Sequence, residues 1–192
     1  MIASFFTFED IEFNKSKKAI ETRTGLIHFG RLLTIGVDVM IKEYRFDKLK
    51  SLGNEKIKEY ENRITALSFM DQETYGKYNS KLYGIVENKK NRYIVFEDLG
   101  NMVLKEYLLK RTNSLPKGQL MLIAFDIVSA LNIYSEMRFP HQGLHLNNIY
   151  MKAGRWILGP PEPYTEEDIY KVDSREINYK SPESVEFEKY TS

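Results

Sequence analysis

The residues from His141 to Met151 carry the side chains whose types and spacing could do chemistry. This stretch reads His-Gln-Gly-Leu-His-Leu-Asn-Asn-Ile-Tyr-Met. His141 and His145 are four residues apart, as in a zinc-binding H-x-x-x-H site, but Gly143 lies between them and no third ligand is recognisable. We therefore interpret both histidines as structural loop residues and expect no metal site.

The same stretch resembles the catalytic loop of protein kinases, H-R-D-L-x-x-x-N. His141 falls on the histidine of that motif, Leu144 on the leucine and Asn148 on the metal-binding asparagine. Gly143 falls where kinases have the catalytic aspartate, which orients the substrate hydroxyl and accepts its proton. Glycine has no side chain to do either, so the resemblance implies a degenerate catalytic loop and no catalytic residue.

A second resemblance lies near the N-terminus. Residues 24–31, Thr-Gly-Leu-Ile-His-Phe-Gly-Arg, are similar to the kinase Gly-rich loop G-x-G-x-F-G, with Gly25, Phe29 and Gly30 in place. Ile27 replaces the middle glycine, and its β-branched side chain would obstruct the close approach of the backbone to nucleotide phosphates. The alternative interpretation of this run is a plain β-hairpin.

Val39-Met-Ile-Lys42 resembles the V-A-I-K strand whose lysine reaches the nucleotide phosphates in kinases. A pattern typical of an amphipathic helix follows, with apolar residues at Ile57, Tyr60, Ile64 and Leu67. Within it, Glu61 resembles the glutamate that pairs with the strand lysine, and Glu59 is a competing assignment. The alternative is that Lys42 and Glu61 are ordinary exposed charges.

Residues 93–100, Tyr-Ile-Val-Phe-Glu-Asp-Leu-Gly, resemble the last N-lobe strand and the hinge of a kinase. The resemblance places Phe96 at the gatekeeper position, where its bulk would narrow an adenine pocket, and Glu97 and Leu99 in the hinge. A vestigial nucleotide pocket is therefore implied, made of Gly25, Gly30, Lys42, Glu61, Phe96, Glu97 and Leu99.

Hydrophobic patterning predicts the elements that must position these residues. Strands are expected in residues 20–36, with a turn at Gly36, and in residues 37–44, 81–86 and 93–96. A short helix is expected at 102–109. Residues 118–134 are apolar on nearly every side, which predicts a buried core helix and not a membrane span; no apolar run approaches spanning length.

The kinase metal-binding motif D-F-G falls on Gly159-Pro-Pro or, with a shift of one residue, on Pro160-Pro-Glu. Neither alignment has an aspartate for magnesium. Residues 179–183, Tyr-Lys-Ser-Pro-Glu, resemble the A-P-E motif. The preceding segment, 164–181, is rich in Thr, Tyr and Ser, and the sequence leaves open whether these are phosphoacceptors or solvated residues.

Composition restricts the remaining function classes. The chain has 192 residues, with 28 basic against 27 acidic side chains and no cysteine. Because no global field favours a polyanion, we expect neither a nucleic-acid nor a membrane partner. The first residues lack the basic region of a signal peptide, so a soluble, intracellular (cytoplasmic) protein is expected.

The expected fold is α+β and protein kinase-like, with a small antiparallel β N-lobe plus helix in residues 1–100 and a partial helical C-lobe in residues 101–192. The expected function is that of a pseudokinase, a non-catalytic scaffold or structural subunit of a larger assembly, with no cofactor. One alternative is an active kinase whose carboxylates have moved to Glu162, Asp168 or Asp38. Others are an allosteric regulator that binds ATP weakly without metal, and an interaction module unrelated to kinases.

The end of the sequence also bears on partners. Kinase domains continue past A-P-E into helices that cover the long helix of the large lobe, whereas this sequence stops nine residues after Glu183. An uncovered apolar face is rarely tolerated in a monomer. We therefore expect a protein partner over the incomplete C-lobe, with self-association second and a shortened chain as the third explanation.

Overall fold

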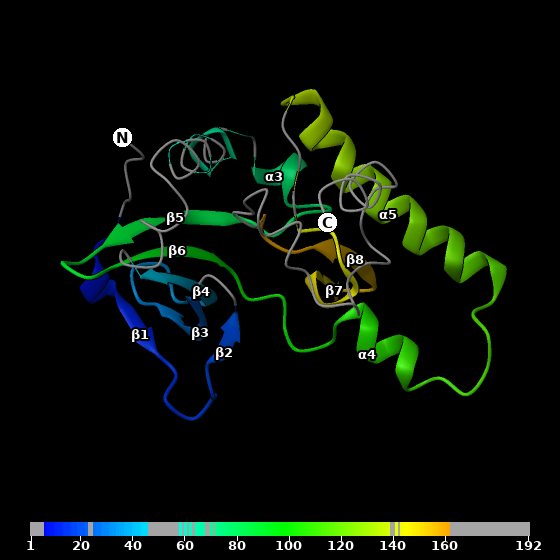
Figure 1. The fold of residues 1–192 in the computed structure, drawn as a ribbon, viewed down its shortest axis with the longest axis horizontal. Coiled ribbons are helices and arrows are strands. Elements are labelled where there is room, and N and C mark those ends of the chain that lie inside the picture. Colours follow the sequence, from blue (N-terminus) through cyan, green and yellow to red (C-terminus); the bar gives the residue numbers. More distant parts are fainter. Residues whose placement is uncertain are drawn as a thin grey trace, which may run out of the picture.

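The computed structural model describes residues 6–22, 25–45, 58, 60, 62, 64–67, 70, 72–138, 141 and 143–161. An antiparallel β-sheet lies beside a helical part, and a small hairpin sits between the sheet and the long helix (Figure 1). The α+β class expected from the sequence, with an antiparallel N-lobe sheet, is thus confirmed.

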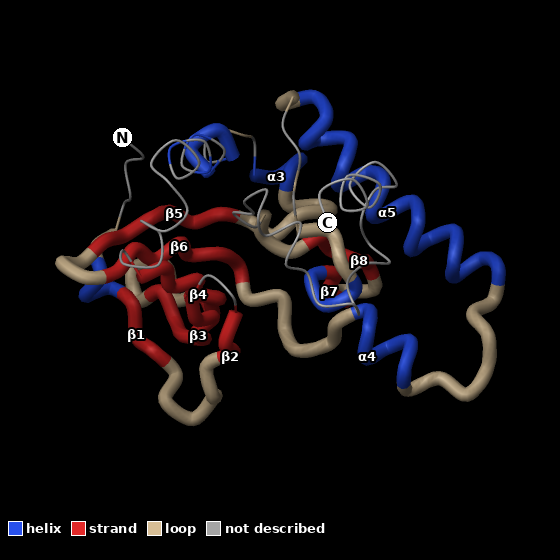
Figure 2. Tube along the Cα trace, in the orientation of Figure 1, coloured by secondary structure: helices blue, strands red, loops and turns tan. Residues whose placement is uncertain are grey.

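The sheet has six strands in the order β1-β3-β4-β6-β5, and β2 pairs with β3 beside this path. Figure 2 shows these strands gathered into one layer. Their bounds are Ile11–Phe13 (β1), Ile20–Thr22 (β2), Gly25–Leu32 (β3), Val37–Arg45 (β4), Leu82–Glu87 (β5) and Asn91–Glu97 (β6). All pairings are antiparallel. The predicted strands are confirmed, whereas β1 was not predicted.

The central strand β4 separates two apolar layers. Val39 and Ile41 point into a cluster with the N-terminal residues, and Met40 and Tyr44 point into the larger core that also contains the helices. This is the period-two alternation that the sequence predicts. The turn before β4 uses Gly36 at φ +67°, a conformation that a side chain disfavours, as expected.

The helical part contains α3 (Gln72–Tyr75), α4 (Leu104–Leu109), α5 (Lys117–Glu136) and the short 3₁₀ helix η2 (Leu146–Asn148); another 3₁₀ helix, η1 (Phe8–Asp10), precedes β1. Strands β7 (Ile149–Lys152) and β8 (Arg155–Leu158) form the hairpin. Residues 102–109 and 118–134 were predicted as helices, and α4 and α5 confirm them.

Backbone hydrogen bonds join the hairpin to the segments around it. Leu158 donates its N–H to the Tyr78 carbonyl at 2.7 Å, and Ser80 donates to the Leu158 carbonyl at 2.9 Å. On the other strand, Met151 donates to the Met102 carbonyl at 2.8 Å. The hairpin is therefore fixed both to the chain that enters β5 and to the chain that leaves β6.

Helix α5 departs from the sequence-based prediction. Ile123, Ala130, Ile133 and Tyr134 are buried, but a second apolar face is exposed; its members are Leu120, Met121, Leu122, Phe125 and Val128, which are 55–64% exposed. The expectation of a helix buried on every side is wrong, because these side chains stay more than half exposed even where the Phe125 ring meets the Tyr78 ring at 6.2 Å. We call these five residues the exposed α5 face.

Helix α5 is also long and apolar enough, by length and composition alone, to cross a membrane, with a mean hydropathy of 1.3. The expectation that no apolar segment approaches this length therefore does not hold. Length and composition alone do not distinguish a membrane-spanning helix from a core helix, since core helices pass the same test. In this fold α5 packs its other face on β8 and carries the buried Asp126 there.

Candidate functional site

The catalytic-loop-like segment is built around a buried, neutral histidine. Nδ1 of His141 accepts the Gly143 N–H at 3.2 Å, so Nε2 carries the proton and donates it to the Gly159 carbonyl at 2.9 Å. Burial lowers the pKa of His141 to about 3, although the bond to Gly159 favours the charged form. The imidazole thus connects the loop to the segment after β8 and holds no charge at neutral pH.

Asn148 makes a second connection between the same two segments. It ends η2, and its side-chain Nδ2 donates both hydrogens, to the Gly143 carbonyl at 2.9 Å and to the Pro160 carbonyl at 3.0 Å. Its backbone carbonyl accepts the Gly159 N–H at 2.8 Å. Because the amide is buried and its donors are both used, this geometry makes Asn148 a structural brace.

Gly159 is packed directly against that brace. A Cβ at this position would collide with Oδ1 of Asn148 and would lie 2.8 Å from Cε2 of Tyr150. In kinases, the D-F-G aspartate and the loop asparagine hold the same metal ions, so they must be neighbours. The contact between Asn148 and Gly159 therefore favours the alignment of D-F-G with Gly159-Pro160-Pro161 over the alternative shifted by one residue.

Lys42 lies in the middle of β4, opposite Ile27 of β3 and Ile94 of β6. Its side chain is 1% exposed, and its Nζ lies 5.6 Å from the centroid of the Tyr44 ring. It is therefore no snorkelling surface lysine. Glu61 and Glu59 lie outside the described residues, so the predicted pair of Lys42 and Glu61 stays a prediction.

The two glycines assigned to a phosphate-binding loop lie within strand β3. A Cβ on Gly25 would collide with the Glu43 carbonyl, and one on Gly30 would collide with the Glu12 carbonyl. Their lack of a side chain is thus explained by close strand packing. The run lies in β3, which pairs with β4 in a β-hairpin, and its assignment to a nucleotide pocket stays a prediction.

The residues assigned to the gatekeeper and hinge lie where β6 ends. Phe96 is fully buried in the large core, and Leu99 is 3% exposed. Glu97 pairs with Lys152 of β7 at 2.7 Å, and the same Lys152 Nζ donates to the Asp98 carbonyl at 3.3 Å. Sequence reasoning missed Lys152, because no motif marks a lysine that reaches back from a hairpin to the hinge.

The chemistry of this arrangement is limited because two of its positions lack carboxylates. Gly143 and Gly159 have no side chains, and the described residues include no group of three or more His, Asp or Glu side chains that could hold a metal ion. Asp38, an alternative carboxylate, is exposed at the start of β4, roughly 13 Å along the strand from Lys42. Glu162 and Asp168 lie outside the described residues.

Comparison with known families identifies a related group of proteins. The sequence matches the family model described as protein tyrosine and serine/threonine kinase over residues 35–192. The matched range begins just before β4 and includes Lys42, the hinge, the loop at His141 and Gly159. Strands β1 to β3 lie before it.

Proposed function

The chain belongs to the protein tyrosine and serine/threonine kinase family, and we propose that it is a pseudokinase that acts as a non-catalytic scaffold or structural subunit of a larger protein assembly. Phosphoryl transfer depends almost entirely on positioning and on stabilisation of charge, for which kinases use a loop aspartate and magnesium. A kinase fold without those groups retains its surfaces and loses the reaction.

One contact supports this function above the others, namely the packing of Asn148 against Gly159. The kinase metal site needs a carboxylate beside the asparagine, and here that position has no room for even a Cβ. Both side-chain hydrogens of the asparagine bind backbone carbonyls. The two positions that would hold magnesium in a kinase are thus used here to join the loop to the segment after β8. In addition, Gly143 provides no catalytic base.

The buried Lys42 supports a second candidate, a regulator that binds nucleotide without transferring phosphate. In kinases the lysine of this strand contacts the nucleotide phosphates, and the buried Lys42 keeps that cation without the metal ligands. With Asn148 alone to coordinate an ion, any ATP affinity should not depend on magnesium.

Nucleotide titration separates these functions. The melting temperature of the full chain is measured with ATP, with and without magnesium, and with Lys42→Met as the control of similar side-chain volume. For a scaffold we expect no shift, and for a nucleotide-binding regulator a shift that is equal with and without magnesium and absent in Lys42→Met. Tight binding of ATP that requires magnesium would contradict both.

A further inference from the structure

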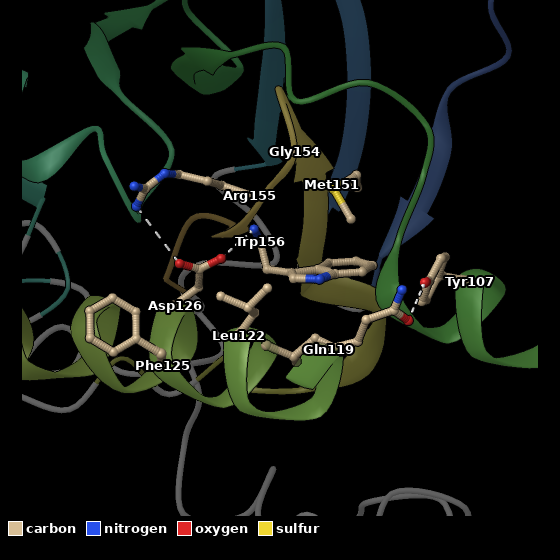
Figure 3. A pocket seen from close by; sticks show the side chains of 10 residues that line it. Tyr107, Gln119, Leu122, Phe125, Asp126, Met151, Gly154, Arg155 and Trp156 are labelled. Atoms are coloured by element: carbon tan, nitrogen blue, oxygen red, sulfur yellow. Dashed lines mark hydrogen bonds and ion pairs between the residues drawn. The ribbon is translucent and has the colours of Figure 1, made fainter. Parts of the chain in front are cut away.

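A groove lies in the helical part of the molecule. Its cavity measures about 380 Å³ and is bounded by α4, α5 and the β7–β8 hairpin. Figure 3 shows the ring of Trp156 over helix α5, with Leu122 below it and Tyr107 at one end. The Tyr107 and Trp156 rings pack edge to face at 5.2 Å, so this wall is aromatic and rigid.

The groove continues into the exposed α5 face. Leu122 and Phe125 line the groove and are 63% and 59% exposed. Soluble monomers rarely expose contiguous apolar patches of this kind unless a partner uses them. The apolar surface therefore extends beyond what one small ligand would cover, and this favours a protein segment as the occupant.

The ends of the groove decide the charge of that occupant. Arg155 lies at one end and Tyr107 at the other (Figure 3). The Arg155 guanidinium side chain is 54% exposed, and Arg111 stacks on Tyr107 at 5.4 Å while donating to its hydroxyl. The Nε–H of Arg111 is buried and finds no acceptor among the described residues. A guanidinium group therefore lies at the Arg155 end of the groove, and a second one, that of Arg111, is held against Tyr107 at the other end.

The acidic residue of the groove, Asp126, offsets the charge of Arg155 only in part, because the arginine side chain stays 54% exposed. Asp126 is 6% exposed, its Oδ2 accepts the Trp156 N–H at 2.9 Å, and its Oδ1 lies 3.8 Å from the Arg155 guanidinium. One oxygen is therefore committed to the backbone of β8. The other faces Arg155 at a distance too long for a strong ion pair.

We propose that this groove binds an acidic segment of a partner protein, with one bulky apolar side chain seated between Trp156 and Leu122 and flanking carboxylates on Arg155 and Arg111. Guanidinium groups hold carboxylates in two-pronged hydrogen bonds, and an apolar anchor in an aromatic pocket supplies most of the energy of such contacts. This inference rests on the proposed scaffold function and adds to it the class of partner segment that the groove would bind.

The only tryptophan of the chain, Trp156, lies in the groove and reports binding directly. The probes are two synthetic peptides with one Leu-Phe centre, one flanked by Asp and Glu and the other by Lys and Arg. We expect the acidic peptide to change the Trp156 emission and to bind at least tenfold more tightly than the basic one. Equal binding of the two peptides, or no binding of the acidic one, would overturn the proposal.

Variants then locate the contact. Leu122→Ser should weaken binding of the acidic peptide at least tenfold. Leu33→Ser should leave this binding unchanged, because Leu33 is also more than half exposed but lies in the turn before β4. Arg155→Gln should weaken binding and Arg155→Lys should retain most of it. Circular dichroism checks that each variant folds. An affinity for the acidic peptide that stays the same in Leu122→Ser and Arg155→Gln would also overturn the proposal. Phosphotransfer is measured separately and tests the pseudokinase assignment.

Discussion

Gly159 is packed so closely against the side-chain amide of Asn148 that no Cβ fits between them. The amide in turn binds the carbonyls of Gly143 and Pro160. The segment after β8 and the loop after α5 are therefore held together by hydrogen bonds at the place where kinases hold metal ions. Under the proposed function, this structural contact takes the place of a metal site, and it accounts for the glycine at position 159.

Replacing Gly159 by alanine should therefore destabilise the fold. The new Cβ must displace the Asn148 amide or the Tyr150 ring, which costs about 1–3 kcal/mol for overpacking and broken hydrogen bonds. The matched control is Gly118→Ala, because Gly118 lies in the first turn of α5 with nothing within 4 Å of an added Cβ. It should be neutral or stabilise by roughly 0.5–1 kcal/mol. Urea unfolding measures both, and equal effects would refute the close contact.

Asn148→Asp distinguishes a brace from a metal ligand. The carboxylate cannot donate, so it would face the Gly143 and Pro160 carbonyls, and a loss of about 2–4 kcal/mol in unfolding free energy is expected. Added magnesium should not restore the lost stability. If Asn148 were a metal ligand, aspartate would coordinate at least as well, and magnesium would recover the midpoint.

His141 should make stability depend on pH in the acidic range. Its folded-state pKa, about 3, lies below the ordinary value of 6.5, so below pH 6.5 the unfolded chain binds a proton that the folded chain does not. Stability should fall as the pH falls from 6.5 towards 3, by up to about 1.4 kcal/mol per unit, and the histidine contribution should level off below that. His141→Gln should flatten this slope. Identical slopes in both proteins between pH 6 and 4 would contradict the burial of a neutral imidazole.

Asp126 should stabilise the fold mainly as an acceptor for β8. Asp126→Ala leaves the buried Trp156 N–H without a partner and should cost about 1–3 kcal/mol. Asp126→Asn keeps an acceptor oxygen and loses only the long interaction with Arg155, so it should cost less than about 1 kcal/mol. The unfolding midpoint in urea, followed by Trp156 emission, compares them. Equal losses would assign the effect to the charge instead.

The sheet was predictable from the sequence because its determinants are local. Alternation in residues 37–44 fixes the two faces of β4, and Gly36 marks the turn. The burial of α5 was predicted wrongly, since an all-round apolar helix indicates burial only if enough neighbouring elements exist to surround it. That number is a property of the whole fold, which no window of the sequence contains.

Motif order predicted the loop residues of the candidate site, but their roles depend on contacts between distant segments. His141 and Asn148 were recognised by spacing, whereas their bonds to Gly159 and Pro160 join residues 18 and 12 positions apart, respectively. Gly25 and Gly30 were also recognised by a motif, but the motif gave only one of two reasons for a glycine at these positions. A motif match suggested a loop, and strand pairing with β4 and β1 required the same glycines for another reason.

Phosphotransfer tests the central claim most directly. The full chain is incubated with γ-labelled ATP and magnesium, alone and with mixed Ser, Thr and Tyr peptide substrates, beside Lys42→Met. Because Gly143 and Gly159 provide neither the base nor the metal ligand, we predict incorporation equal to that of Lys42→Met and of a blank without protein. Incorporation above the blank that disappears in Lys42→Met would show a working active site and contradict the pseudokinase assignment.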